Sequence, residues 1–389
     1  MVAPFAFELL AEDPASAARA GRFHTPHGSF ETPVFMPVGT RGAMKGVTAA
    51  ELRETGAEIV LANAYHLMQR PGEEVVEALG GLHRFMGWAG PLLTDSGGFQ
   101  VWSLAHRARL DPEGVTFRSE VDGAEVRLTP ERAVEVQERL GADVVMPLDH
   151  CIQYPASRED VARAVETTVG WARRSVAARR RADQALFPIV QGGVFTDLRV
   201  ACAQALVELG APGYAVGGVS VGEPREEGLA ALSAANAELP RDRPRYVMGV
   251  GTPRDFLDAV AAGADMMDCV LPTRNARHHA ALTREGTLRL RNAQWARDPR
   301  PLDAECRCFT CRTHSRGYLR HLATVGEFLG PALLTIHNLT FMMDLCREAR
   351  AALREGRFGA FRAATLTRLG EAEHFGPRGG NADGPGDRG

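Results

Sequence analysis

Lysine is almost absent from this sequence, since Lys45 is the only copy among 45 basic residues. Long apolar runs are absent too, and none approaches the roughly 20 residues of a membrane-spanning helix, so we expect no membrane protein. The first 20 residues carry acids and lack a basic segment leading into an apolar one, which argues against a secretory signal and indicates a cytoplasmic protein. Seven cysteines in 389 residues are few, and a chain this long buries enough core to need no disulfide framework.

What is present is an ordinary globular composition. Hydrophobic residues make up 45% of the chain and charged residues 24%, values that exclude collagen, a coiled coil and a wholly disordered chain. The length fits two or three average domains, or one large α/β barrel with additions.

Charge is unevenly distributed along the chain. The formal net charge of −3 gives the whole molecule no positive excess for nucleic acid. Residues 274–320, however, contain eleven arginines and only four carboxylates. A basic patch on an acidic body is typical of a phosphate-binding surface. The alternative is an arginine-rich composition without a ligand, because lysine is nearly missing throughout.

Eight short apolar runs along residues 33–271 predict strands, because they are rich in β-branched residues or end in glycine or a polar residue. Strands that alternate with helical stretches favour a parallel sheet. Eight such units favour a closed (β/α)₈ TIM barrel over an open doubly wound sheet. The runs lie near Val34, Val60, Leu93, Val145, Ile189, Val216, Val247 and Met267, and helices are expected over 48–56, 130–141, 157–181, 197–210 and 254–263.

Three segments depart from the barrel pattern. The first thirty residues predict a small antiparallel sheet. Residues 114–128 form two alternating runs around Asp122-Gly123, which predicts a β-hairpin inserted after the third barrel strand. Residues 375–389 have no apolar periodicity, so we expect a disordered tail there.

Polar residues and glycines gather where the predicted strands end. Catalytic groups of TIM barrels lie at the carboxyl ends of the strands, so these residues are expected to converge on one mouth. Asp95 and Asp149 end the third and fourth runs, Gln191 ends the fifth, and Asp268 lies in the eighth. The small residues at the same ends are Ser96, Gly97, Gly98, Gly192, Gly193, Gly217, Gly218, Gly249 and Gly251.

These residue types suit a base-exchange or glycosidic reaction. One carboxylate can attack an anomeric carbon while another moves a proton, as in retaining glycosidases. Neighbouring carboxylates also push their pKa values apart, which leaves one as an acid or base near neutrality. Asp, Gln and glycine N–H groups can bind the donor and acceptor edge of a purine. For each residue alone the alternative is structural, since an Asp after a strand is often a helix N-cap and Gly-Gly is often a turn.

A second constellation combines three cysteines with a later histidine: Cys306, Cys308, Cys311 and His337. Such a set makes a closed tetrahedral zinc site, which offers no open position for catalysis and is therefore structural. His314 competes as the fourth ligand, and a redox-active cysteine group is the alternative, although it lacks an identifiable partner thiol. We expect one structural Zn²⁺ per subunit, held in a subdomain at about 292–345 within a single barrel domain over 1–374.

Two further segments are candidates for phosphate or RNA contacts. The run Gly249-Val250-Gly251-Thr252 follows a late strand, where barrels often hold a phosphate, but a lone G-x-G carries little weight. Arg274 and Arg277 follow Asp268 and suit phosphates or base edges, with unpartnered surface arginines as the alternative. We interpret His278-His279 as solvated loop histidines rather than as a metal pair.

Five motifs taken together resemble those of the bacterial tRNA-guanine transglycosylases, over most of residues 20–374. They are DSGGFQ at 95–100, VQGG at 190–193, YAVGGVSVGE at 214–223, DCVLPTRNAR at 268–277 and the cysteine–histidine set. The resemblance implies a zinc-bearing (β/α)₈ barrel that is homodimeric. It also implies exchange of the wobble guanine of GUN anticodons, in the tRNAs for Asp, Asn, His and Tyr, for 7-aminomethyl-7-deazaguanine (preQ1) in queuosine biosynthesis.

The resemblance implies roles for individual residues. Asp268 resembles the nucleophile that attacks ribose C1′ and forms a covalent tRNA intermediate as guanine leaves, and Asp95 resembles the proton acceptor for the incoming base. The wobble base must leave its stack to reach such a site. The implied base-binding residues are Asp95, Ser96, Gly97, Gly98, Phe99, Asp149, Gln191, Gly217, Gly218 and Met248, with Phe99 and Met248 on the two faces of the ring. The implied RNA-contacting residues are Gly249, Val250, Gly251, Thr252, Pro253, Arg254 and Asp255, and Thr273, Arg274, Asn275, Ala276 and Arg277.

The sequence departs from the family pattern at some of these positions. Phe99 stands where many bacterial members have Tyr, and His278-His279 replaces the more usual Asn-Gly. Val221 is the bulky residue expected of preQ1 users. We expect no further RNA-binding domain after residue 374, which would argue against the archaeal type.

Two hypotheses from other classes stay open. One is a non-catalytic RNA-binding subunit of the same fold, disfavoured because Asp95 and Asp268 are both present. The other is a carbohydrate hydrolase, disfavoured by the zinc motif and the arginine-rich segment.

Overall fold

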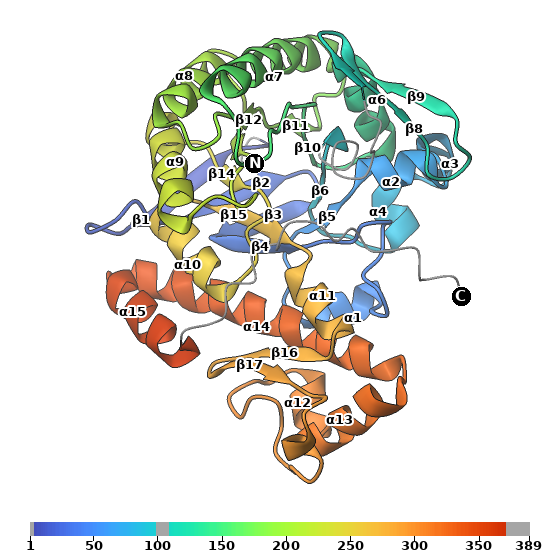
Figure 1. Ribbon diagram of the computed structural model, residues 1–389, viewed down its shortest axis with the longest axis vertical. Coiled ribbons are helices and arrows are strands. Elements are labelled where there is room, and N and C mark those ends of the chain that lie inside the picture. Colours follow the sequence, from blue (N-terminus) through green and yellow to red (C-terminus); the bar gives the residue numbers. More distant parts are fainter. Residues whose placement is uncertain (1–3, 99–108, 371–389) are drawn as a thin grey trace.

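The computed structural model describes residues 4–98 and 109–370. Its centre is made of parallel strands in two sheets (Figure 1). One sheet has the order β12 (Ile189–Val190), β13 (Tyr214–Val216), β14 (Arg245–Val247), β15 (Met266–Cys269), β4 (Val34–Pro37). The other has the order β11 (Ala185–Leu186), β10 (Val144–Val145), β6 (Leu92–Thr94), β5 (Val60–Ala62).

All eight apolar runs contain the predicted strands. The fifth run is divided into β11 and β12 by Phe187 and Pro188. Val38, directly after β4, forms an isolated parallel bridge with Leu61 of β5, so the two sheets meet at this point. The result is an α/β fold of parallel sheets and helices, consistent with a TIM-like arrangement.

Residues along each strand alternate between two apolar clusters. Val34 and Met36 of β4 pack into a cluster with Ile59, Leu93 and other strand residues. Phe35, between them, packs into the larger cluster that also contains helix residues. Both faces of the strands are therefore buried, which explains why the strands read as continuous apolar runs rather than as alternating ones.

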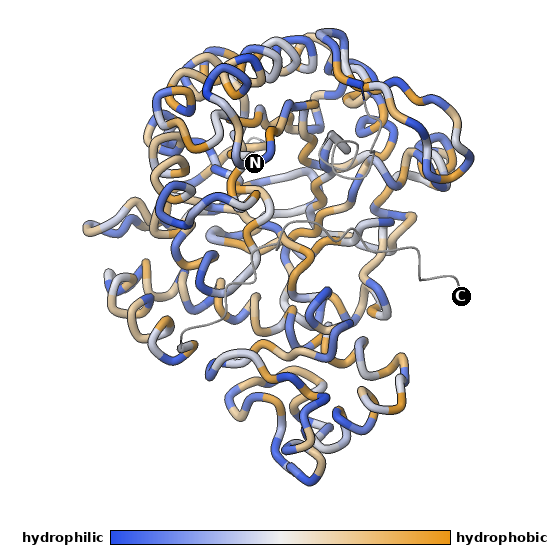
Figure 2. The backbone as a smooth tube through the Cα atoms, viewed as in Figure 1, coloured by the Kyte–Doolittle hydropathy of each residue, from blue (hydrophilic) through white to orange (hydrophobic). Residues whose placement is uncertain are grey.

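Helices follow most of the strands and lie outside them (Figure 1). Thr48, Thr129, Ser157 and Thr252 each cap a helix, because their side chains accept a hydrogen bond from a main-chain N–H in the first turn. Figure 2 shows hydrophobic and hydrophilic residues interleaved along these outer helices, as one buried face and one solvated face require. The helices are α1 (Ala49–Glu54), α2 (Ala64–Gln69), α3 (Glu73–Ala78), α4 (Gly81–Met86), α6 (Pro130–Leu140), α7 (Arg158–Ala178), α8 (Thr196–Val207), α9 (Arg225–Glu238) and α10 (Pro253–Ala261).

The two antiparallel additions predicted from the sequence are present. The first is the sheet β1 (Phe7–Glu12), β2 (Arg19–Thr25), β3 (Gly28–Thr32). The second contains the predicted hairpin as β8 (Gly114–Arg118) and β9 (Glu125–Leu128). A third strand, β7 (Arg109–Asp111), pairs with β8 and was not predicted.

A smaller lobe follows β15 and is joined to the parallel sheets by one long helix. The lobe contains α11 (Leu271–Arg277), the hairpin β16 (Ala280–Thr283) and β17 (Gly286–Arg289), the short 3-10 helix η1 (Ala293–Trp295), α12 (Phe309–Thr313) and α13 (Arg316–Val325). In Figure 1, α14 (Leu329–Arg354) crosses between this lobe and the parallel strands, and α15 (Phe358–Leu369) follows it. Because α14 contacts β4, α11 and β16, it ties the lobe to the central sheets.

A buried carboxylate links the amino ends of β6 and β10 through hydrogen bonds. Asp143, just before β10, accepts hydrogen bonds from the Leu92 N–H and from the rings of His27 and His83, at 2.9, 2.7 and 3.2 Å. These side chains lie at the opposite end of the strands from the predicted mouth. Among the helices of the described ranges, none has the length and apolar character to cross a membrane.

Candidate active site and metal centre

Asp268 lies on β15 with its carboxylate held by two donors. The Tyr246 hydroxyl donates to Oδ1 at 2.6 Å, and the Gly249 N–H donates to the same oxygen at 2.9 Å. Burial raises the pKa of Asp268, and the two hydrogen bonds oppose the rise. One carboxylate oxygen is therefore fixed by protein donors, and Oδ2 accepts no hydrogen bond from the described residues.

Asp95 follows β6, and both of its carboxylate oxygens accept a hydrogen bond. The side-chain amide of Asn63 donates to Oδ2 at 2.5 Å and the Ala64 N–H donates to Oδ1 at 2.8 Å. Burial raises the pKa of Tyr246 well above its usual value, and the charges of Asp268 and Asp95 add to the rise. Both carboxylates predicted to carry the chemistry therefore raise the pKa of the same phenol.

The glycines after Asp95 are required by close packing. Gly97 has a φ of +79°, and a Cβ there would lie 2.8 Å from the Cβ of Tyr65. A Cβ at Gly98 would lie 3.0 Å from Leu148, in the segment that leads to Asp149. The Ser96 hydroxyl accepts the Gly98 N–H at 3.2 Å. Phe99, the predicted stacking residue, lies outside the described residues.

Asp149 and Gln191 form a pair at the ends of β10 and β12. The Gln191 side-chain amide donates to Asp149 Oδ2 at 2.7 Å. Burial raises the pKa of Asp149 to about 6, although the hydrogen bond from Gln191 lowers it. A Cβ at Gly217 would lie 2.7 Å from Nε2 of Gln191, and one at Gly218 would clash with Oε1. The structure therefore brings Asp149, Gln191, Gly217 and Gly218 into one group.

Met248 and the predicted RNA-contacting segments continue from β14 and β15. Met248 is partly buried and packs against the apolar cluster that contains Val34 and Met36. A Cβ at Gly251 would overlap the Cβ of Cys269, so the segment after β14 lies against the end of β15. In α11, Arg274 is exposed, whereas Thr273 and Ala276 are buried. Of these three side chains, only that of Arg274 lies on the surface where RNA could reach it.

Sequence reasoning missed three residues of this region. Tyr246 lies within a predicted strand, and only its hydroxyl in an otherwise apolar run signals a polar partner. Asn63 directly follows β5, so it shares the strand-end position that singled out the aspartates. Arg199 lies inside α8 with all its side-chain hydrogen bonds going to main-chain carbonyls, and no pattern in the sequence indicates this.

The second constellation is assembled as predicted. The Cys306, Cys308 and Cys311 sulfurs lie 3.6, 3.6 and 3.3 Å from Nδ1 of His337. Zinc bonds of about 2.3 Å to sulfur and 2.0 Å to nitrogen in a tetrahedron give an S···N separation of about 3.5 Å, so the four donors fit this ion. His314 is not in the group. Its ring instead stacks on Tyr318 at 5.0 Å.

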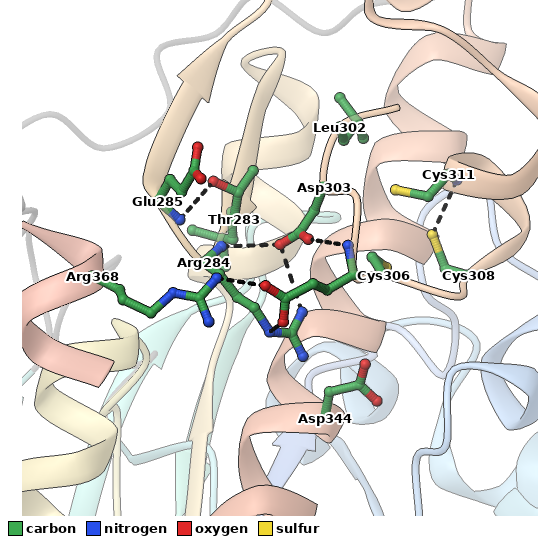
Figure 3. Close-up of polar contacts among 12 residues, drawn as sticks. Thr283, Arg284, Glu285, Leu302, Asp303, Cys306, Cys308, Cys311, Asp344 and Arg368 are labelled. Atoms are coloured by element: carbon green, nitrogen blue, oxygen red, sulfur yellow. Dashed lines mark hydrogen bonds and ion pairs between the residues drawn. The ribbon is translucent and has the colours of Figure 1, made fainter. Parts of the chain in front are cut away.

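The surroundings of the four donors favour metal binding. Nε2 of His337 lies 2.7 Å from the Leu282 carbonyl, an acceptor that holds the proton on Nε2 and leaves Nδ1 free for a metal. Hydrogen bonds from Cys306 and Cys311 lower the pKa of Cys308 and so favour the thiolate that binds metal. Figure 3 shows Asp303 beside the cysteine segment, where it accepts the Arg284 N–H at 3.0 Å.

The chain as a whole is similar to known proteins. The family described as Queuine tRNA-ribosyltransferase matches residues 13–371. The chain belongs to this family. A queuine tRNA-ribosyltransferase of Pelotomaculum thermopropionicum is 52% identical to it over 92% of this chain and 96% of that protein. The proteins of the same name from Thermus thermophilus and Thermosynechococcus vestitus are each 51% identical, over 92% and 94% of this chain and 92% and 97% of their own lengths.

Membership confirms the resemblance drawn from the five motifs. Members of the queuine tRNA-ribosyltransferase family are transferases that act on tRNA, and the chain is therefore a tRNA-guanine ribosyltransferase. The donor atoms of Cys306, Cys308, Cys311 and His337 lie close enough together to hold a metal ion.

Proposed function

We propose that the protein exchanges the wobble guanine of GUN-anticodon tRNAs for preQ1 through a covalent intermediate on Asp268. The observation that carries the proposal is the Asp268 carboxylate on β15, with Oδ1 held by two donors and Oδ2 accepting no hydrogen bond from the described residues. Oδ1 of Asp268 is held by Tyr246 and Gly249. The carboxylate is thus oriented while the other oxygen remains available for attack.

The reaction proceeds in two displacements. Asp268 attacks ribose C1′, a C–O bond forms, and the bond from C1′ to N9 of guanine breaks with its electron pair passing to the base. The departing guanine takes up a proton from water, and the proton that Asp95 later accepts from preQ1 returns to solvent. Asp95 then accepts the N9 proton of preQ1, whose N9 attacks C1′ and releases Asp268. Two carboxylates with these separate duties are the arrangement of retaining glycosidases.

The base is held by the group around Asp149. Its carboxylate suits the N1–H and 2-amino donors of a guanine-type base, and the Gln191 amide and the Gly218 N–H suit the O6 acceptor. Ser96, Gly97, Gly98 and Gly217 shape the site, with Phe99 and Met248 proposed on the two faces of the ring. Val221 is the bulky residue proposed to favour preQ1 over larger bases.

RNA is proposed to lie along the segments 249–255 and 273–277. Arg274 is exposed there, and eleven arginines lie within 274–320. Recognition would rest on phosphates and splayed loop bases. Because phosphate contacts release counterions, tRNA affinity should fall steeply with salt.

Zinc is proposed as the structural ion of the Cys306/Cys308/Cys311/His337 set. When bound, it cross-links the cysteine segment to α14. Further proposals are that the parallel strands close into a (β/α)₈ barrel within a single domain over 1–374, and that two chains form a homodimer. Exposed apolar side chains on the small lobe support the homodimer: Phe309, Tyr318, Val325, Phe328 and Leu329.

Guanine exchange is the experiment that tests this function. The purified protein is incubated with an unmodified GUN-anticodon tRNA and labelled guanine or preQ1. Label entering the wobble position, and none entering a tRNA without that guanine, is expected. Asp268→Ala should abolish both label incorporation and the covalent protein–tRNA band on a denaturing gel. Tight tRNA binding without incorporation by the unaltered protein would instead indicate a non-catalytic RNA-binding subunit.

A further inference from the structure

Arg199 is a buried cation at the carboxyl ends of two neighbouring strands. The residue is 0% exposed. Its Nη1 donates to the carbonyls of Val190 and Gly217 at 2.9 and 2.6 Å. Nη2 donates to the carbonyl of Gly218 at 2.8 Å, and Nε to that of Gly193 at 2.9 Å. The guanidinium thus joins the ends of β12 and β13 through four main-chain oxygens.

The cation has no carboxylate partner within hydrogen-bond distance among the described residues. Arg19, which is almost as buried, shows the usual solution, an ion pair with Asp265 at 2.5 Å. Burying a charge without a counter-charge is costly. Burial lowers the pKa of Arg199 to about 10, so the side chain still carries its charge at neutral pH. Its hydrogen-bond acceptors among the described residues are main-chain carbonyls, with the charge of Glu223 adding longer-range support, and these carbonyls lie where the base is proposed to bind.

The four contacts fix the direction of two peptide N–H groups. In a trans peptide the N–H points away from the carbonyl of the same plane. Since the carbonyls of Gly217 and Gly218 face Arg199, the N–H groups of Gly218 and Val219 face the opposite side. Gly218 has a φ of +62°, a conformation that brings successive N–H groups together into an anion-binding concavity.

These N–H groups are available to a ligand. Within residues 4–98 and 109–370, neither the Gly218 nor the Val219 N–H donates to a protein acceptor. The Gln191 side chain, which donates to Asp149, lies against both Gly217 and Gly218. Two N–H donors therefore lie beside the group proposed to bind the purine.

We propose that Arg199 is a positioning residue that orients and polarises the Gly218 and Val219 N–H groups toward the carbonyl oxygen of the purine. The inference rests on the proposed function. As the bond from C1′ to N9 breaks, its electron pair passes to the base and spreads onto the carbonyl oxygen. Donation by the guanidinium to a peptide oxygen strengthens the N–H of that peptide as a donor. The cation thereby stabilises the departing base without touching it, as donors do in an oxyanion hole.

Single-turnover formation of the covalent tRNA complex tests the inference. Arg199→Gln removes the charge and the fork of donors. The expected result is a rate 10²- to 10³-fold lower, about the range found when one oxyanion donor is lost, with tRNA affinity changed less than about threefold. Arg199→Lys keeps the charge but loses the several N–H donors of the guanidinium, so its rate should lie between those of the unaltered protein and Arg199→Gln. A rate for Arg199→Gln within about threefold of the unaltered protein would overturn the proposal.

A change in the base itself separates this role from a purely structural one. With 6-thioguanine as the incoming base, a sulfur replaces the carbonyl oxygen and accepts hydrogen bonds poorly. The unaltered protein should favour guanine over 6-thioguanine, and Arg199→Gln should lose most of that preference. An equal preference in both proteins would mean that Arg199 only supports the fold.

Arg245 provides the matched control. It is also buried, and its Nη2 donates to the carbonyl of Leu239 at 2.8 Å, but it begins β14 at the opposite end of the strand. Arg245→Gln should lower the melting temperature without changing the preference between the two bases. If the unaltered protein forms no covalent complex with any GUN tRNA, the proposed function fails. If it reacts and Arg199→Gln reacts equally well, only the role of Arg199 fails.

Discussion

Tyr246 donates a 2.6 Å hydrogen bond to Oδ1 of Asp268. Burial raises the pKa of that carboxyl group, and the hydrogen bond lowers it again. The phenol thus favours the ionised carboxylate and partly offsets the burial, which favours the neutral acid. A nucleophile at this position needs the charged form, so Tyr246 acts through Asp268.

Tyr246→Phe should therefore shift the pH dependence of covalent complex formation. Without the hydroxyl the pKa of Asp268 rises, and the acidic limb of the rate profile moves to higher pH. Loss of a hydrogen bond to a charged group corresponds to roughly 1.5–3 kcal/mol, so the acidic limb should move up by about 1–2 pH units. Tyr214→Phe, on the neighbouring strand with its hydroxyl near the Val207 carbonyl, should leave the profile unchanged. An acidic limb at the same pH in the unaltered protein, Tyr246→Phe and Tyr214→Phe would contradict the role of Tyr246.

Base binding should depend on pH through Asp149. Because burial raises its pKa to about 6, the carboxyl group is neutral below this pH and ionised above it. The ionised form accepts from N1–H and the 2-amino group, so the KM for guanine should fall as pH rises from 5 to 7. Asp149→Asn should raise KM and remove this dependence. A KM that stays flat in the unaltered protein would exclude Asp149 from the role.

Asp149→Asn, which should weaken base binding, should at the same time stabilise the folded protein. The pKa of Asp149 is higher in the folded protein than the usual 3.8, so ionisation costs folding free energy above pH 6 and nothing below both values. Asp149→Asn should thus raise the melting temperature at pH 8 more than at pH 5. Calorimetry at the two pH values measures the difference.

Gly218 and Gly210 form a matched pair of glycines for testing the base site. Their φ angles are +62° and +63°, so an alanine is strained to a similar degree at either position. Only at Gly218 would the new Cβ clash with Gln191, whereas Gly210 has open space. Gly218→Ala should raise the KM for guanine at least tenfold, and Gly210→Ala should lower only the melting temperature. Equal KM values for the two variants would show that the Gln191 side chain is not part of base binding.

Metal removal should act on stability and RNA binding before it acts on chemistry. The ligand His337 is followed by Asn338, whose amide group accepts the Leu282 N–H at 2.8 Å and donates to the Pro272 carbonyl at 2.9 Å. The metal site is therefore linked to α11, which bears Arg274. Chelation should lower the melting temperature by several degrees and weaken tRNA binding more than exchange at saturating tRNA. Added Zn²⁺ should restore both, and an unchanged melting curve after verified metal loss would contradict a structural ion.

Asn338→Ala tests the hydrogen bonds between α14 and α11 separately from the metal site. It leaves all four donors in place but removes the contacts to Pro272 and Leu282. Zinc content should stay at one per chain while tRNA affinity falls. Loss of zinc from this variant would mean that the amide supports the metal site rather than α11.

Much of this arrangement was predictable because it follows from local patterns. Continuous apolar runs predict strands buried on both faces, and strand ends in a parallel fold share one edge, which is why Asp95, Asp149 and Asp268 stood out. The metal ligands were predictable because sulfur and imidazole donors are chemically distinctive. Strand β7 was missed because its three residues have no apolar pattern. Tyr246 and Arg199 were missed because their partners are far apart in the sequence or belong to the main chain.

The adjacency of His337 and Asn338 on α14 also limits how the protein can change. Consecutive residues of a helix point about 100° apart, so one inserted or deleted residue before them would rotate both away from the cysteines and from α11 at once. Loops of the small lobe can vary in length as long as His337 and Asn338 keep their directions on α14. Chimaeras that exchange only the segment between β17 and Cys306, which carries none of the four donors, should keep the ion, whereas those that alter the start of α14 by a single residue should lose the ion and the position of α11 together.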